Sequence, residues 1–198
     1  MTGTRKPEHL FYEEIQACER CDLCSLSINE RKGKTPGAGY TDADIVVLGL
    51  ATGFYRDKDV FSGTPFNFFN EELYDGEGMN VASRVRKALE EMLETAGIDR
   101  ENVFITNIMK CSTPKDREPD NEEIAACFDW FNEEIAAIKP KMIICLGQKV
   151  SSFFALKPME SQKQGNTVII ASYHPAYSVY SGNKRFFKEL KKEIEKYE

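Results

Sequence analysis

Histidine is scarce in this chain, which has only two, His9 and His174, among its 198 residues. No apolar run is long enough to cross a bilayer, so we expect no membrane partner. Residues 1–14 are polar and charged and contain no hydrophobic segment, so we expect no signal peptide. These absences predict a cytoplasmic protein, in which the six cysteines serve as ligands or buried thiols rather than as disulfides.

Internal repeats, linkers and low-complexity segments are also lacking, so we expect a single domain over residues 1–198. Hydrophobic residues make up 41% of the chain and charged residues 29%, as in ordinary globular proteins. The net charge of −6 argues against a chain coated with nucleic acid. Clusters of lysine and arginine still allow a local phosphate-binding face, although each cluster can also be a solvated helix face.

Four short and nearly continuous apolar runs predict buried parallel strands, at residues 44–49, 102–106, 141–146 and 167–171. Helical patterns fill the intervals, at residues 81–96, 121–138 and 148–156, and again at residues 183–197. Residues 7–18 are expected to be helical too. Strands that alternate with helices predict an α/β fold, a three-layer αβα sandwich with a central four-stranded parallel sheet. Functional loops then lie at the carboxyl ends of the strands.

The cysteines are the strongest candidates for a metal site. Cys21 and Cys24 form a CxxC, and Cys111 and Cys127 follow far downstream on a loop and on the next predicted helix. Four thiolates brought together by folding hold either an iron–sulfur cluster or a structural zinc ion, and the spacing favours a cluster only mildly. Cys18 is a competing ligand. Cys145 lies in an apolar strand, where a small core residue is the simplest interpretation.

Two loops carry features suited to binding a planar ligand. The glycine-rich turn at residues 49–53 lets backbone amides approach a ligand, although an ordinary tight turn is the alternative. Phe66 follows Pro65, and an aromatic ring presented by a rigid backbone can stack on a nucleobase. The alternative for Phe66 is a side chain tucked into the core.

Two polar residues follow predicted strands. Asn107 offers an amide donor and an acceptor, which suit the edge of a uracil-like ring; a strand-end cap is the alternative. His174 follows the last strand, where it could donate a hydrogen bond to a developing oxyanion, or could simply cap a loop. His9 lies in the polar N-terminal segment, and we expect no role for it.

Together these segments resemble the family 4 uracil-DNA glycosylases, the iron–sulfur branch of the uracil-DNA glycosylase superfamily. The resemblance runs from Cys21 to Tyr177 and keeps the order of the motifs. The matching segments are CDLCSL at 21–26, GLATG at 49–53, GTPF at 63–66, TN at 106–107, KC at 110–111 and HPAY at 174–177.

The resemblance implies a structural [4Fe–4S] cluster on Cys21, Cys24, Cys111 and Cys127, with Cys18 as a bystander. It also implies a glycosylase that flips a base out of single- or double-stranded DNA and hydrolyses its glycosidic bond, working as a monomer. The implied base-binding residues are Gly49, Leu50, Ala51, Gly53, Phe66, Asn107 and His174, with Asn107 and His174 catalytic. The implied contacts to the DNA backbone are Lys115, Arg117, Lys184 and Arg185.

One departure from the family pattern concerns the first loop. The family usually has Glu after the first glycine and Pro before the last, where this chain has Leu50 and Thr52. The carboxylate that would position water is therefore missing from the loop. The leading hypothesis is a uracil-removing DNA glycosylase, or one acting on a related base. The alternatives are a non-catalytic iron–sulfur protein that binds DNA or a modified base, and a zinc-stabilised α/β protein.

Overall fold

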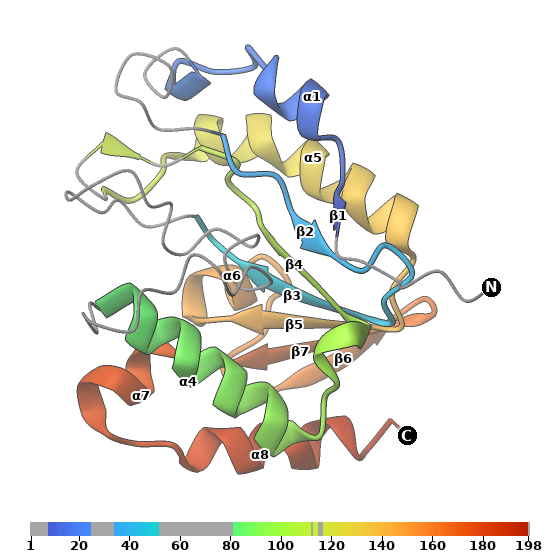
Figure 1. The fold of residues 1–198 in the computed structure, drawn as a ribbon, viewed down its shortest axis with the longest axis vertical. Coiled ribbons are helices and arrows are strands. Elements are labelled where there is room, and N and C mark those ends of the chain that lie inside the picture. The colour runs from blue at the N-terminus through green and yellow to red at the C-terminus, as the bar shows by residue number, and fades with distance from the viewer. Residues whose placement is uncertain (1–7, 25–33, 52–80, 112, 115–116, 198) are drawn as a thin grey trace.

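A computed structural model describes residues 8–24, 34–51, 81–111, 113–114 and 117–197. Its centre is a seven-stranded sheet with the strand order β1-β2-β4-β3-β5-β7-β6 (Figure 1). The four middle strands run parallel to one another and confirm the sheet predicted from the apolar runs. They are β3 (Ile45–Gly49), β4 (Val103–Asn107), β5 (Met142–Leu146) and β7 (Thr167–Ser172).

Three short antiparallel strands extend this parallel centre and were not predicted. On one side β1 (Glu8–His9) pairs with β2 (Ala38–Gly39), and β2 pairs with β4. On the other side β6 (Ser161–Gln164) pairs with β7. β1 and β2 have two residues each and β6 is polar throughout, so none carries the apolar pattern that indicates a strand.

Helices cover both faces of the sheet and complete the three-layer sandwich (Figure 1). α1 (Tyr12–Gln16), α5 (Asn121–Ile138) and α6 (Gln148–Ser152) pack on one face. α4 (Val81–Ala96) and α8 (Arg185–Ile194) pack on the other, with α7 (Ala176–Ser181) against α4. A short 3-10 turn, η2 (Arg100–Asn102), leads into β4.

The helix predicted over residues 7–18 is much shorter in the structure. Phe11 adopts a left-handed backbone with φ 53°, so α1 begins only at Tyr12, and Glu8–His9 join the sheet as β1. The predictions for α4 and α5 are correct to the residue, because each has a long amphipathic pattern with a clear stop.

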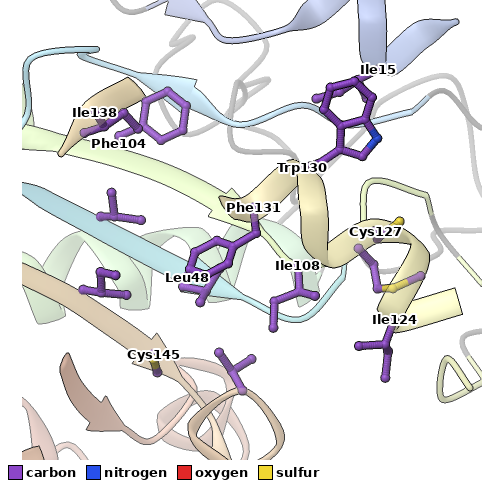
Figure 2. Close-up of a cluster of buried hydrophobic side chains, with 14 of the residues drawn as sticks. Ile15, Leu48, Phe104, Ile108, Ile124, Cys127, Trp130, Phe131, Ile138 and Cys145 are labelled. Carbon is purple, nitrogen blue, oxygen red and sulfur yellow. The ribbon is translucent and has the colours of Figure 1, made fainter. Parts of the chain in front are cut away.

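Side chains on the two faces of the central strands pack into two separate hydrophobic cores. Val46 and Leu48 of β3 face the cluster beneath α5, whereas Val47 faces the cluster beneath α4 and α8. In Figure 2 Leu48 and Phe131 of α5 lie against each other, while Trp130 extends toward Ile15 of α1. The sheet is therefore a rigid platform whose strand ends are fixed from both faces. No helix in the described ranges combines the length and apolarity needed to cross a bilayer.

Candidate active site and metal centre

The carboxyl ends of the four parallel strands place the candidate residues on one edge of the sheet. Gly49 of β3 is in register with Asn107 of β4, and Leu146 of β5 is in register with Ser172 of β7. His174 follows Ser172 by two residues. Neighbouring strands lie about 4.8 Å apart, so three steps separate the ends of β4 and β7 by roughly 14 Å. Asn107 and His174 thus lie on the same edge of the sheet, at opposite ends of the row of four parallel strands.

Asn107 and Gly49 are in direct contact. Asn107 is buried, and its Oδ1 would lie 2.2 Å from a Cβ atom added to Gly49. A contact that short does not occur between real atoms, so the position of the Asn107 amide requires glycine at residue 49. This gives the glycine-rich turn a specific role that the sequence pattern alone did not reveal.

The loop after β3 is fastened to the loop after β4 by backbone hydrogen bonds. Ile108 N–H donates to Gly49 O at 3.0 Å, and Met109 N–H donates to Leu50 O at 2.8 Å. Leu50 and Ala51 are partly buried against the core cluster beneath α5. Leu50 therefore contributes an apolar side chain at a position where the family pattern has a carboxylate.

His174 has a defined hydrogen-bonding state. Its Nδ1 accepts a hydrogen bond from the backbone N–H of Ala176 at 3.1 Å. A neutral ring in this arrangement carries its proton on Nε2, which becomes the donor. The residue is exposed among the described residues, yet enough protein surrounds the ring that desolvation lowers its pKa below the ordinary value. Both features favour a neutral imidazole that presents an Nε2–H.

The cysteines of the N-terminal segment gather beside α5. The Sγ of Cys24 lies 4.0 Å from that of Cys21 and 3.8 Å from that of Cys18. The Cys127 thiol interacts electrostatically with Cys18 and Cys24. Cys111 is buried in the hydrophobic core cluster beneath α5 that also contains these cysteines. Cys18, a competing ligand by its spacing and a bystander by the family resemblance, thus lies beside Cys24 in the structure. All six cysteines are free thiols in the structure.

The thiols of the pocket differ in their affinity for protons. Burial and the neighbouring Cys24 raise the pKa of Cys21 to about 11. Burial also acts to raise the pKa of Cys24, but hydrogen bonds with the Cys21 backbone and with the Cys18 side chain outweigh it and lower the pKa. Desolvation raises the pKa of Cys127.

Lys34 and Trp130, two residues that sequence analysis missed, hold the N-terminal segment in place. Lys34 donates from Nζ to the backbone oxygens of Gln16, at 2.8 Å, and Cys18, while the Gln16 amide donates back to Lys34 O at 2.8 Å. Trp130 donates from Nε1 to Cys18 Sγ at 3.4 Å, and the Arg20 guanidinium lies 4.0 Å above the indole ring. A single tryptophan in a helix gave no sign of this role.

The donor set suits a thiolate-bound metal. As the side chains stand, no three cysteine, histidine, aspartate or glutamate groups in the described ranges meet the geometry of a metal-ion site. Cys18 and Cys21 nevertheless lie within 4.0 Å of Cys24, and Cys127 interacts electrostatically with Cys18 and Cys24; soft sulfur donors of this kind select iron–sulfur clusters, zinc or copper. Cys21, Cys24, Cys111 and Cys127 can supply four thiolates, the number that a [4Fe–4S] cluster takes.

Comparison with known proteins identifies the family. A family model described as the uracil DNA glycosylase superfamily matches residues 36–196. A type-4 uracil-DNA glycosylase of Archaeoglobus fulgidus is 35% identical over 84% of this chain and 80% of its own length. The chain belongs to the uracil-DNA glycosylase superfamily. A type-4 uracil-DNA glycosylase of Thermotoga maritima is 30% identical over 96% of this chain and 93% of its own length, and one of Sulfurisphaera tokodaii is 30% identical over 87% and 76%.

Two of the predicted DNA contacts of this uracil-DNA glycosylase superfamily member, Arg117 and Lys184, form ion pairs with carboxylates. Arg117 makes a two-pronged ion pair with Glu123, one prong at 2.8 Å. Glu123 also completes the capping box that starts α5 at Asp120. Lys184 lies 2.6 Å from a carboxylate oxygen of Glu91. These charges are partly compensated, so their contacts with phosphate stay predictions.

Of the four remaining predicted site residues of this uracil-DNA glycosylase superfamily member, the structure describes one. Arg185 is exposed at the start of α8. Gly53, Phe66 and Lys115 lie outside the described residues.

Proposed function

We propose that this protein hydrolyses the N-glycosidic bond of uracil, or of a related damaged or modified base, in DNA, as a step of base excision repair. Its family membership supports the class of reaction. The observation that carries the proposal is the neutral, Nε2-donating state of His174 on the same sheet edge as Asn107. Breaking the bond leaves negative charge on the base, and a preorganised donor stabilises developing charge of this kind.

The other predicted site residues bind the flipped base. The base is flipped out of the stack, because its glycosidic bond cannot be reached within the duplex. Asn107, held by Gly49, pairs with the edge of the base, while backbone amides of the 49–53 turn approach its carbonyl groups. Phe66 stacks on the ring. Water then completes the hydrolysis at the sugar.

We infer that Cys21, Cys24, Cys111 and Cys127 hold a [4Fe–4S] cluster with a structural role. The sulfurs lie between the N-terminal segment and α5, so a bound cluster ties these two parts together. A zinc ion is the alternative occupant. Brown protein whose visible absorption is bleached by dithionite supports the cluster, and colourless, zinc-loaded protein from an anaerobic preparation contradicts it.

The second candidate function is a non-catalytic iron–sulfur protein that binds DNA or a modified base. The apolar contact of Leu50 favours it, because the residue that would position water is missing there. The test is base release from single- and double-stranded oligonucleotides carrying uracil, hypoxanthine, xanthine or 5-substituted uracils. Alkali-labile sites support the glycosylase, whereas tight binding with no abasic product on any substrate supports the binding protein. A cytoplasmic location, a monomeric state and a single domain over residues 1–198 stay predictions.

Replacing Gly49 by alanine should lower base release at least about 10-fold, because the added Cβ displaces the Asn107 amide and its hydrogen bonds to the base. Single-turnover release from a uracil oligonucleotide measures the effect. Gly165→Ala is the control: Gly165 also resists substitution, with φ 60°, but no atom lies within 4 Å of its added Cβ. Equal losses in both variants would show that the Asn107 contact is not the cause.

The pH dependence of base release should follow His174. Its pKa is lowered, so the neutral ring persists above that value and is lost as the pH falls through it, below the ordinary 6.5. A proton on Nδ1 would then face the Ala176 N–H, which removes the hydrogen bond that orients the ring. The profile of kcat/KM against pH should fall on its acid side with an apparent pKa under 6.5. An acid limb at or above 6.5 would contradict this assignment.

A further inference from the structure

A lysine and a glutamate lie fully inside the protein beside the candidate active site. The side chains of Lys110 and Glu134 are 2% and 0% exposed, and Lys110 Nζ lies 2.8 Å from Glu134 Oε2. Burying two charges is costly and is tolerated only when each is paired and hydrogen-bonded. The pair comes from the loop after β4 and from the middle of α5.

Each polar atom of this pair has a partner. Lys110 Nζ donates its three protons to Glu134 Oε2, to Thr106 Oγ1 at 2.8 Å and to the backbone oxygen of Asn107 at 2.7 Å. The hydroxyl of Thr106 donates in turn to Glu134 Oε2 at 2.7 Å. Glu134 Oε1 accepts from the backbone N–H of Gly37 at 3.1 Å. The ammonium is thus held in one place by three acceptors.

One of those acceptors belongs to the residue that faces the base. Asn107 is the last residue of β4. The hydrogen bond to its carbonyl oxygen fixes the peptide plane that follows its Cα, and this restrains the direction in which the Asn107 side chain projects. Gly49 limits the Asn107 side chain from the other direction. The amide of Asn107 is therefore oriented by two independent contacts, one on its backbone and one on its side chain.

The backbone of Lys110 extends the network to the sulfur pocket. A backbone hydrogen bond from Lys110 acts to lower the pKa of the Cys127 thiol, and the Lys110 carbonyl accepts from Thr35 N–H at 2.6 Å and Thr35 Oγ1 at 3.2 Å. Cys111 is the next residue. Lys110 therefore connects the candidate metal centre with the residue that reads the base.

We propose that Lys110, balanced by Glu134, is the positioning residue for Asn107 and thereby sets the affinity of the site for the flipped base. The proposal rests on the proposed function, because it assigns Asn107 to that base. A charge pair that only stabilised the core would affect all DNA ligands equally. A positioning pair affects DNA that carries the base and spares DNA that lacks it.

Binding measurements in a His174→Ala background test the proposal, because substrate is then consumed about 10²–10³-fold more slowly. The ligands are one oligonucleotide with uracil and the same oligonucleotide with a stable abasic-site analogue. Glu134→Gln keeps an oxygen for the Gly37 N–H but removes the charge opposite Lys110. It should weaken binding of uracil DNA about 10-fold, as the loss of one oriented hydrogen bond predicts, and change binding of abasic DNA less than about 2-fold.

Two further variants sharpen the result. Glu133→Gln alters the neighbouring carboxylate, which is 43% exposed and pairs with Arg20, and it should leave both affinities unchanged. If Glu134→Gln fails to fold, Lys110→Met combined with Glu134→Gln removes both charges together, and should show the same selective loss. Circular dichroism and iron content report folding separately from binding.

The coupling to Asn107 is the decisive measurement. In an Asn107→Ala background, Glu134→Gln should cause no additional loss of affinity for uracil DNA. An additive loss there, or equal losses on uracil and abasic DNA, would overturn the positioning role. If the protein with both Lys110 and Glu134 intact binds uracil DNA no better than undamaged DNA, the proposed function itself fails and the positioning role fails with it.

Discussion

Replacing His174 by alanine should lower the rate of base release about 10²–10³-fold, the usual cost of removing one preorganised donor to a developing anion. The donor is Nε2–H, because Nδ1 is occupied by the Ala176 N–H. Single-turnover release of uracil measures the loss. DNA binding should change far less, since the donor acts mainly on charge that develops as the bond breaks.

The other histidine provides a matched control for this substitution. The ring of His9 hydrogen-bonds Gly37 O at 3.1 Å at the far edge of the sheet, and desolvation lowers its pKa as it does for His174. His9→Gln keeps a polar partner for Gly37 and should release uracil at the rate of the unaltered protein. A His174→Ala protein that keeps full activity would show that another group stabilises the departing base.

Replacing Cys127 by alanine should remove the visible absorption of the purified protein and most of its iron. Cys127 interacts with Lys110 and lies on the helix that faces the N-terminal segment. Because a metal-bound site is part of the folded state, its loss should also lower the melting temperature and free the N-terminal segment for proteolysis. Iron analysis, absorption spectra and limited proteolysis measure these effects.

Cys145→Ala is the control for the loss of a buried sulfur. Cys145 lies within β5, and desolvation alone raises the pKa of its thiol to about 12, as expected for a thiol among apolar neighbours. Its replacement leaves a small cavity that should cost about 1 kcal/mol in stability without loss of colour. If both variants kept their iron, or both lost it, Cys127 would not be a ligand.

The sequence was sufficient to predict the central strands and the edge that carries the site. Strands such as β3 and β5 are continuous apolar runs, and parallel strands bring the residues that follow them to one edge. That is why Asn107 and His174 could be expected to share an edge. The strands β1, β2 and β6 could not be predicted, because their pairing depends on neighbours distant in the chain rather than on an apolar pattern.

The buried charges could not be predicted for a related reason. Glu134 lies next to Glu133 in an acidic stretch of α5, and the sequence does not distinguish the glutamate that enters the core from the one that faces solvent. Only the rotation of α5 against β4 decides this. Cys18 was expected as a competing ligand, because two overlapping cysteine pairs fit the same spacing, and the structure brings all three sulfurs together.

The order of the strands has a consequence for how the protein is made. β3 is central and is synthesised early, but its two neighbours, β4 and β5, follow it by dozens of residues. Every candidate cysteine ligand has been synthesised by residue 127, before β5, β7 and His174 leave the ribosome. A nascent chain can therefore bring its thiolates together while half of the parallel sheet is still absent. Metal capture during translation would then give the late strands a preformed edge on which to dock.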